Sequence, residues 1–213
     1  MLSTKVLKSL LTKKGRREYG LFLMEGEKVV LENAGEAVQI IRQDESPKLF
    51  KELSSLENST GVIGVFKIPS GESAAISSRI LVLDRIQDPG NMGTILRTAV
   101  AFGWTTVILL DCVDVYSPKV VRAVSGQLFK LDIIDMSFEE IQRLGLNLVV
   151  ADIKGEEVKR IDGDVALVLG NEGAGVRQEI LDMARKRISI PMEEDVESLN
   201  VAIAGGILMC YLR

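Results

Sequence analysis

The chain has 213 residues, of which 46% are hydrophobic and 26% are charged. These values are typical of a globular protein with a sizeable core, and they exclude a disordered, collagen-like or low-complexity chain. Histidine is absent, which excludes a Ser-His-Asp triad, a Cys-His dyad and histidine metal ligands. Any catalysis must therefore use arginine, lysine, carboxylate, hydroxyl or amide groups, or a cofactor.

The net charge of −4 is unevenly distributed along the chain. Residues 1–24 hold six cations and one carboxylate, a net charge of +5, so that the remaining residues carry −9. A basic arm on an acidic body favours an anionic partner such as RNA. A solvated amphipathic helix explains the same charges equally well, and both interpretations stay open. The candidate RNA-binding cations are Lys13, Lys14, Arg16 and Arg17.

Two features of the sequence favour a cytoplasmic protein. The N-terminus has no apolar segment before a cleavage site, so a signal peptide is not expected. The longest apolar run, residues 201–212, is shorter than the roughly 20 residues that a membrane span needs. Cys112 and Cys210 both lie in apolar runs, which favours two core side chains over a disulfide.

The first third of the chain predicts a small α/β domain. Apolar residues at helical spacing predict a helix over residues 3–14, which Gly15 would end. Further helices are expected over 27–34 and 47–56, and strands over 22–24, 38–42 and 62–68. The sequence Pro69-Ser70-Gly71-Glu72-Ser73 is typical of a linker. We therefore predict one domain over residues 1–70 and a second over residues 71–213.

Strand and helix patterns alternate after this linker. Strands are expected over 79–83, 106–110, 131–134, 148–151, 165–169 and 187–190. Helices are expected over 93–102, 117–125, 138–143, 176–184 and 198–212. Short apolar strands that alternate with helices predict a buried, mostly parallel sheet with helices on both faces.

Three polar segments follow strands of this predicted sheet. They begin at Asn91 in the first segment, at Gly170 in the second and at Ile190 in the third, which leads to Ser198 and Asn200. Because ligands of such sheets bind outside the carboxyl ends of the strands, the segments predict one site. Taken singly, each segment is also explained as a helix cap, a tight turn or a helix start.

The second segment, Gly170-Asn171-Glu172-Gly173-Ala174-Gly175, excludes two common nucleotide sites. It lacks the third-position glycine of the dinucleotide fingerprint, and no Gly-Lys-Ser/Thr follows. Glycines that allow close backbone approach, together with the Glu172 carboxylate, fit a flat ligand with an amine or hydroxyl donor better than a pyrophosphate. An unrelated nucleotide-binding dehydrogenase or hydrolase is therefore a weak alternative.

Together the segments resemble the SpoU (TrmH) family of RNA ribose 2′-O-methyltransferases, within the SPOUT superfamily. Asn91-x-Gly93-x-x-x-Arg97 matches the first motif of the family, and Gly170-x-Glu172-Gly173-x-Gly175 matches the second. Ile188-Ser189-Ile190-Pro191-Met192, followed by Ser198-Leu199-Asn200-Val201, matches the third. The match covers about residues 79–213. Residues 1–30 resemble the start of the family's RNA-binding domain, shortened here relative to the usual L30e-like form.

The resemblance implies an α/β domain whose C-terminal part forms a trefoil knot, and a homodimer without metal. It implies S-adenosylmethionine as cofactor and ribosomal or transfer RNA as substrate, with ribosomal RNA favoured. The implied cofactor-binding residues are Gly170, Ile190, Leu199, Leu169, Ala151 and Met192. The implied catalytic residues are Arg97, Asn91, Glu172, Ser198 and Asn200.

The implied reaction is methyl transfer to a ribose 2′-hydroxyl, and the resemblance assigns the activation of that hydroxyl to Arg97. Guanidinium is effectively never deprotonated, so two hypotheses stay open: Arg97 as the base, or Arg97 as the ligand of an RNA phosphate that takes the proton. An RNA-binding homologue without methyl transfer is the alternative function.

Overall fold

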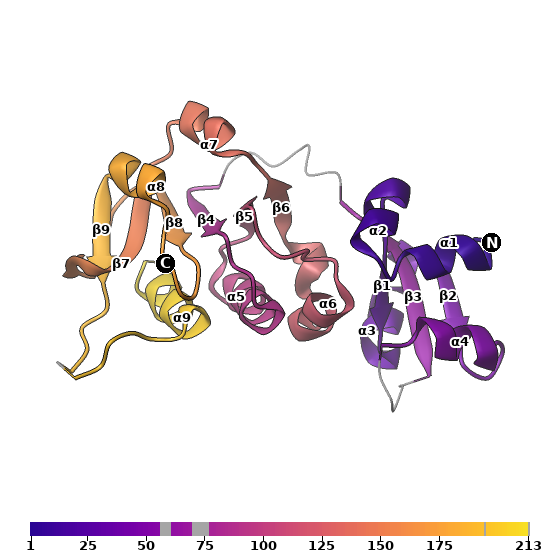
Figure 1. Ribbon diagram of the computed structural model, residues 1–213. Coiled ribbons are helices and arrows are strands. Elements are labelled where there is room, and N and C mark those ends of the chain that lie inside the picture. The colour runs from indigo at the N-terminus through magenta and orange to yellow at the C-terminus, as the bar shows by residue number, and fades with distance from the viewer. Residues whose placement is uncertain (56–60, 70–76, 194, 213) are drawn as a thin grey trace. The chain divides into compact units, whose positions relative to one another are not determined.

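A computed structural model describes residues 1–55, 61–69, 77–193 and 195–212 of the chain (Figure 1). The chain divides into two compact units. Unit 1 consists of Met1–Pro69 with Asp114–Leu128, and unit 2 of Ser70–Val113 with Phe129–Arg213. These units differ from the contiguous ranges 1–70 and 71–213 by the segment 114–128, which follows the expected boundary but groups with unit 1. Most of the expected linker, residues 70–73, lies outside the described residues.

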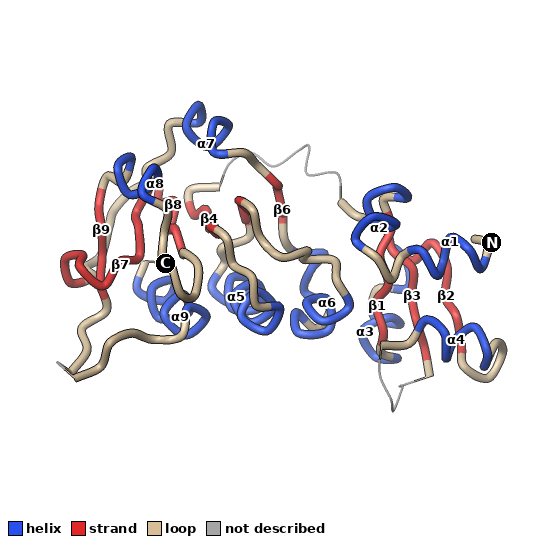
Figure 2. Tube along the Cα trace, in the orientation of Figure 1, coloured by secondary structure: helices blue, strands red, loops and turns tan. Residues whose placement is uncertain are grey.

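Unit 1 is a three-stranded antiparallel sheet with short helices (Figure 2). Its strands are β1 (Leu21–Glu25), β2 (Ala37–Arg42) and β3 (Val62–Lys67), in the order β1-β3-β2. Its helices are α1 (Thr4–Ser9), α2 (Lys13–Tyr19), α3 (Glu27–Glu32), α4 (Pro47–Leu53) and α6 (Pro118–Val124), with the 3-10 turn η1 (Ala34–Glu36). A second 3-10 turn, η2 (Gln127–Lys130), contains the boundary between Leu128 and Phe129.

The segment that contains α6 completes the core of unit 1. Helix α6 packs against β1, and the rings of Phe22 and Tyr116 lie 5.1 Å apart between centroids. Arg16, only 5% exposed, donates from Nε and Nη2 to Oδ2 of Asp114 at 2.9 and 2.6 Å. A fragment of 69 residues would bury little apolar surface by itself. Unit 1 therefore depends on residues that come later in the chain.

Unit 2 is built on a six-stranded sheet in the order β6-β5-β4-β8-β7-β9. All five strand pairs are parallel, which confirms the expected sheet type. The strands are β4 (Arg79–Asp84), β5 (Thr106–Leu110), β6 (Asp132–Asp135), β7 (Leu148–Glu157), β8 (Val165–Leu169) and β9 (Lys186–Ser189). The helices are α5 (Pro89–Phe102), α7 (Phe138–Leu144), α8 (Gln178–Met183) and α9 (Val201–Tyr211).

Helices cover both faces of this sheet, as the alternation predicted. Ile141 of α7 and Ile180 of α8 pack with Val82 and Val168 in one core cluster. Helices α5 and α9 pack against each other, and α9 also packs against β8. Because side chains alternate along a strand, neighbours of the first cluster such as Leu169 point to the second face. The trefoil knot stays a prediction.

One sequence prediction about glycine is wrong. Gly15 does not end the first helix: it lies inside α2, where a side chain would collide with the backbone of Ser9. For Gly205 and Gly206 of α9, small residues in an apolar helix are compatible with either a packed core or a dimer seam. A side chain on Gly205 would lie 2.6 Å from Leu169, and one on Gly206 would lie 3.4 Å from Thr98. Gly205 therefore serves packing within unit 2, and the dimer seam stays a prediction.

Among the described residues, none of the helices combines the length and the apolar character that a membrane span requires.

Candidate active site

The three predicted segments meet at the carboxyl edge of the sheet of unit 2. The first follows β4 and opens α5, the second follows β8, and the third leads from β9 to α9. Strands β4 and β8 are neighbours, and β7 lies between β8 and β9. Because these strands are parallel, their carboxyl ends share one edge, which brings together segments that are far apart in sequence.

Asn91 connects all three segments through its side-chain amide. Its Nδ2 donates to Oε1 of Glu172 at 3.2 Å, and its Oδ1 accepts from Nδ2 of Asn200 at 2.9 Å. The structure thus joins one predicted catalytic residue from each motif into a single hydrogen-bonded group. Asn91 does not cap α5 as its position suggested, because Asp88 accepts from the Asn91 N–H at 2.7 Å.

Glu172 holds the first and second segments together. Besides Asn91, its carboxylate accepts from the backbone N–H groups of Gln87 at 3.4 Å and Asp88 at 3.1 Å. Burial alone raises the pKa of Glu172, but these donors and its own backbone N–H lower it below the ordinary value. Glu172 is therefore a carboxylate at neutral pH that organises neighbouring loops.

The loop from Gly170 to Gly175 is closed by Asn171, which the motif analysis did not single out. Asn171 exchanges two backbone hydrogen bonds with Gly175 at 3.1 and 2.9 Å. Its Oδ1 accepts from the backbone N–H groups of Gly173 and Ala174 at 3.0 and 2.9 Å. Gly170 is buried, and a side chain there would collide with the backbone of Gly175 and Val176. This glycine is thus required by the fold of the loop itself.

Sequence reasoning also missed a pair of charged residues at this edge. Asp84, the last residue of β4, is completely buried. Its Oδ1 accepts from Nε of Arg177 at 2.7 Å, and its Oδ2 accepts from the Arg177 backbone N–H at 2.8 Å. The only sequence signal for this pair was a charged residue, Asp84, at the end of an apolar strand. Such a residue is ordinarily exposed, so its burial was not predicted.

Arg97 lies on α5, two turns after the start of the helix, and is exposed. The described part of the chain offers its guanidinium no hydrogen-bond or ion-pair partner. Its donors are therefore available to an external anion.

Ser198 is not the N-cap of the last helix, although a serine before an apolar helix is a common cap. It is exposed and precedes α9, whose N-cap is Asn200. Oδ1 of Asn200 accepts from the backbone N–H groups of Ala202 at 2.9 Å and Ile203 at 3.4 Å. This N-cap explains why a polar residue, Asn200, lies at the start of an apolar helix.

The predicted cofactor residues come from the ends of three neighbouring strands. Leu169 ends β8, Ala151 lies within β7, and Ile190 directly follows β9. Leu169 is buried, whereas Ala151, Ile190, Met192 and Leu199 are only partly buried. Apolar side chains that stay partly open to solvent at such an edge are suited to a flat, mainly apolar ring such as adenine. The residues present thus fit the adenosyl group that the resemblance implied.

The four predicted RNA-binding cations lie on α2 of unit 1. Lys13, Lys14 and Arg17 are exposed. Arg16 is a correction, because its guanidinium is buried against Asp114 and also donates to the Leu10 carbonyl at 2.7 Å. Arg16 stabilises unit 1 and has no free side chain with which to contact RNA.

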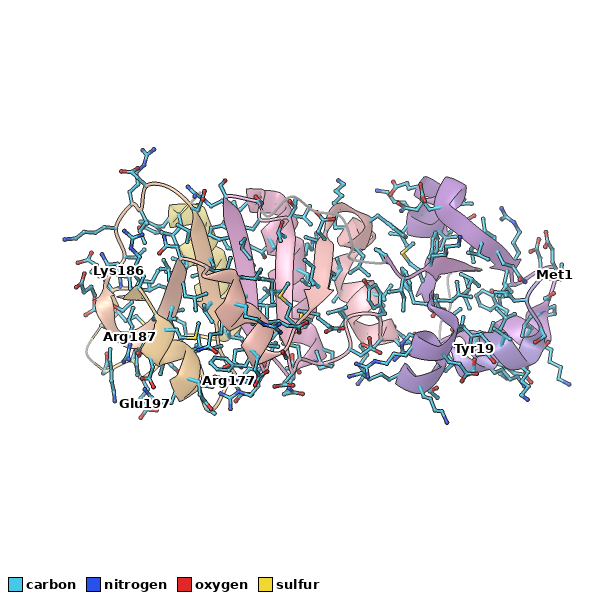
Figure 3. The ribbon with its side chains drawn as sticks, turned by 90° about the horizontal axis from the view of Figure 1, so that it is seen from above. Met1, Tyr19, Arg177, Lys186, Arg187 and Glu197 are labelled. Carbon is cyan, nitrogen blue, oxygen red and sulfur yellow. The ribbon has the colours of Figure 1, made fainter. Side chains whose placement is uncertain are left out.

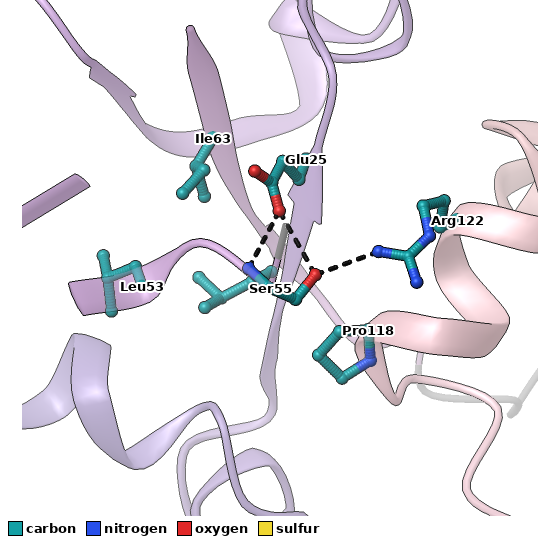
Figure 4. Close-up of a pocket in the computed structure, with 7 residues that line it drawn as sticks. Glu25, Leu53, Ser55, Ile63, Pro118 and Arg122 are labelled. Atoms are coloured by element: carbon teal, nitrogen blue, oxygen red, sulfur yellow. Dashed lines mark hydrogen bonds between the residues drawn. The ribbon is translucent and has the colours of Figure 1, made fainter. Parts of the chain in front are cut away.

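A small cavity lies elsewhere, within unit 1 (Figure 4). Glu25 Oε2 accepts from the backbone N–H and Oγ of Ser55 at 3.1 and 3.2 Å, and Arg122 donates to the same Oγ at 3.1 Å. Ser55 therefore links the Glu25 carboxylate to the Arg122 guanidinium at the wall of this cavity. In the described part of the chain, no three Asp, Glu or Cys side chains come together as metal ligands.

The fold and this site define a parallel α/β protein with a polar site at the carboxyl edge of its sheet. The model of the SpoU rRNA Methylase family matches residues 78–210. The chain belongs to this family, which confirms the resemblance read from the three motifs.

Similar proteins cover nearly the whole chain. A 23S rRNA (guanosine(2553)-2′-O)-methyltransferase, RlmP, of Bacillus subtilis is 30% identical over 97% of this chain and 94% of its own length. The structure of an AdoMet-bound rRNA methyltransferase from Sinorhizobium meliloti matches with a TM-score of 0.84 and 30% identity, over 97% of this chain and 92% of that one. The SpoU methyltransferase AviRb from Streptomyces viridochromogenes, in complex with AdoMet, matches with a TM-score of 0.83 and 25% identity, over 98% and 95%.

Proposed function

We propose that this protein uses S-adenosylmethionine to methylate a ribose 2′-hydroxyl of RNA, with ribosomal RNA as the substrate. The single observation that carries the proposal is the hydrogen-bonded group of Asn91, Glu172 and Asn200, which joins the three family motifs. The exposed Arg97 lies on the same helix as Asn91. Relatives named as 23S rRNA methyltransferases, and AdoMet-bound relatives of the same fold, support both the substrate and the cofactor.

The cofactor supplies a methyl group that is already activated as a sulfonium. The task left to the protein is to hold the 2′-oxygen in line and to manage its proton. Leu169, Gly170, Ile190, Met192 and Leu199 would hold the adenosyl group, and Ala151 would close the pocket at β7.

Arg97 would act on the RNA. Guanidinium groups are effectively never deprotonated in proteins, which favours Arg97 as a ligand of the RNA phosphate over Arg97 as a base. The hydroxyl proton would pass to that phosphate and on to solvent while the 2′-oxygen takes the methyl group, and the sulfonium would leave as a neutral thioether. Asn91, Glu172 and Asn200 keep α5, and with it Arg97, in register with the cofactor loop, while Ser198 is exposed and free to contact the ribose.

The test uses purified protein, labelled methyl donor and total RNA, followed by mapping of the modified nucleotide. We expect incorporation into one ribose of ribosomal RNA. Arg97→Ala should lose methylation at least ~100-fold and keep cofactor binding by calorimetry. Arg160→Ala, which removes an exposed arginine paired with Asp162, serves as the control and should retain activity.

Two outcomes would overturn the proposal. Cofactor binding without incorporation into any RNA would favour an RNA-binding homologue that has lost methyl transfer. Failure of the wild type to bind S-adenosylmethionine at all would exclude the cofactor assignment. Incorporation into transfer RNA alone would keep the enzyme class and correct the substrate.

We also propose a cytoplasmic homodimer, with α9 at the interface and unit 1 reading the RNA through Lys13, Lys14 and Arg17. Ile203 and Tyr211 of α9 are 56% and 61% exposed, and large exposed apolar side chains on one helix favour a protein contact. Ile203→Asp should convert the dimer to a monomer in sedimentation experiments. A wild type that sediments as a monomer would contradict this assignment.

A further inference from the structure

A completely buried carboxylate lies at the base of the Gly170–Gly175 loop. Asp84 ends β4 and is 0% exposed. A buried charge is costly, by several kcal/mol, unless nearby groups compensate it. The groups that bind the Asp84 carboxylate therefore mark a contact that the fold keeps despite this free-energy cost.

Arg177, which is labelled in Figure 3, is the main partner of this carboxylate. It lies two residues after Gly175, and it binds Asp84 through both its backbone N–H and its Nε. Its Nη2 donates to Oδ2 of Asp111 at 2.9 Å. Since Asp84 ends β4 and Asp111 follows β5, one arginine connects the end of the loop to two strand ends.

The two strand ends are held in an unusual backbone conformation. Arg85 and Asp111 have φ values of 57° and 55°, in the left-handed region that non-glycine residues rarely adopt. The Arg85 N–H donates to the Leu110 carbonyl at 2.8 Å, and Nε2 of Gln87 donates to the Asp111 carbonyl at 2.7 Å. Strained residues of this kind persist where the surrounding structure holds them firmly.

The loop is attached at its beginning as well. Nδ2 of Asn171 donates to the Arg85 carbonyl at 2.9 Å, and Glu172 accepts from the backbone of Gln87 and Asp88. The loop is thus fixed to the β4–α5 connection at one end by Asn171 and Glu172, and at the other end by Arg177. Between these attachments lie Gly173 and Gly175, and Gly170, which is predicted to bind the cofactor, directly precedes the first attachment.

From this arrangement we infer that Asp84 and Arg177 are positioning residues for S-adenosylmethionine. They do not contact the reacting atoms. Their ion pair fixes the height and angle of the 170–177 loop above the strand ends, which sets the wall of the cofactor pocket. The inference rests on the proposed function, and it assigns a role to two residues outside the three family motifs.

The test compares Arg177→Lys and Asp84→Asn with Arg79→Lys in the full-length protein. Arg177→Lys keeps the charge but loses the planar guanidinium donors, and Asp84→Asn keeps the shape but loses the charge. Arg79 begins the same strand at its amino end, where Nη1 donates to the Gly163 carbonyl at 2.6 Å. Calorimetry with S-adenosylmethionine, steady-state kinetics and hydrogen exchange of the loop amides are measured for each variant.

For Arg177→Lys and Asp84→Asn we expect the Kd and the KM for S-adenosylmethionine to rise about tenfold. The KM for RNA and kcat should change less than about threefold, because the RNA-contacting residues stay in place. The amides of Gly173 and Ala174 should exchange faster in the protein without cofactor. Arg79→Lys should leave the Kd, both KM values and the exchange of these amides unchanged.

Unchanged cofactor affinity in both site variants, with a loss of thermal stability like that of Arg79→Lys, would overturn the inference. So would an equal rise in the KM for RNA and the KM for S-adenosylmethionine. If the wild type failed to bind S-adenosylmethionine, the proposed function itself would fall. The exchange of the loop amides would still decide whether the ion pair holds the loop.

Discussion

Asn200 and Asn91 are joined by a side-chain hydrogen bond of 2.9 Å, although 109 residues separate them in sequence. Asn200 caps α9 with its carbonyl oxygen and uses its amide nitrogen for this contact. Asn91 uses its own amide nitrogen for Glu172. One pair of side chains thereby fixes the start of α9 against the first turn of α5.

Replacing Asn200 by alanine should lower the free energy of unfolding by about 1–2 kcal/mol, because the helix loses its cap. Ser198→Ala is the control and should change this free energy by less than about 0.5 kcal/mol, since Ser198 is exposed. In a double-mutant cycle that combines Asn200→Ala with Asn91→Ala, urea unfolding should give an interaction free energy between the two residues of at least about 0.5 kcal/mol. Strict additivity would contradict a direct interaction.

The ion pair of Arg16 and Asp114 should be the most sensitive contact of unit 1. Asp114→Ala leaves the Arg16 charge buried without its carboxylate, which should cost about 3–5 kcal/mol. Glu52→Ala removes the partner of Lys8 in an exposed pair and should cost less than about 1 kcal/mol. Urea unfolding of both variants provides the comparison, and equal losses would show that the buried pair is unimportant.

Gly15 should not tolerate a side chain. Gly15→Ala forces the added carbon against the Ser9 backbone and should destabilise the protein by about 1–3 kcal/mol. Gly35 is a matched control, since a side chain there would meet open space. Thermal unfolding should therefore show a clear loss for Gly15→Ala only, and a similar melting temperature for both variants would disprove the close approach.

The two cysteines should differ in reactivity. Burial raises the pKa of the Cys112 thiol to about 11, and its Sγ donates to the Leu83 carbonyl at 3.1 Å. At pH 8 roughly one Cys112 thiol in a thousand is then a thiolate, whereas Cys210 is exposed. Mass spectrometry after brief treatment with iodoacetamide should find the label on Cys210. Rapid labelling of Cys112 in the folded protein would contradict its burial.

The contribution of Glu172 to stability should depend on pH. Its pKa is lower in the folded protein than the ordinary 4.5, so the stabilisation is present above that value and is lost as the pH falls through the folded pKa. Glu172→Gln removes this titration. The difference in melting temperature between wild type and Glu172→Gln should be largest near pH 7 and should shrink below about pH 4.5. A difference that is constant down to pH 3 would exclude a stabilising carboxylate.

Much of the fold could be predicted from local patterns. Apolar strands between helices predicted the parallel sheet, because burial on both faces removes alternation from a strand. The predicted strand over residues 106–110 agrees with β5. The first helix was predicted too long, since α1 ends at Ser9 and Thr12 caps a second helix, in which Gly15 lies close to the Ser9 backbone. The location of residues 114–128 in unit 1 depends on Arg16 and Phe22, which are distant in sequence.

For the site, the sequence by itself determined the chemistry that is available: no histidine, three polar segments at strand ends, and one arginine at the spacing of a known motif. Only the tertiary structure decided which of these groups meet. It joined Asn91 to Glu172 and Asn200, assigned the cap of α9 to Asn200 instead of Ser198, and buried Arg16. It also revealed Asp84 with Arg177. The physical reason is that a motif specifies local backbone and residue type, whereas burial and pairing depend on strand order, which brings distant segments to one edge.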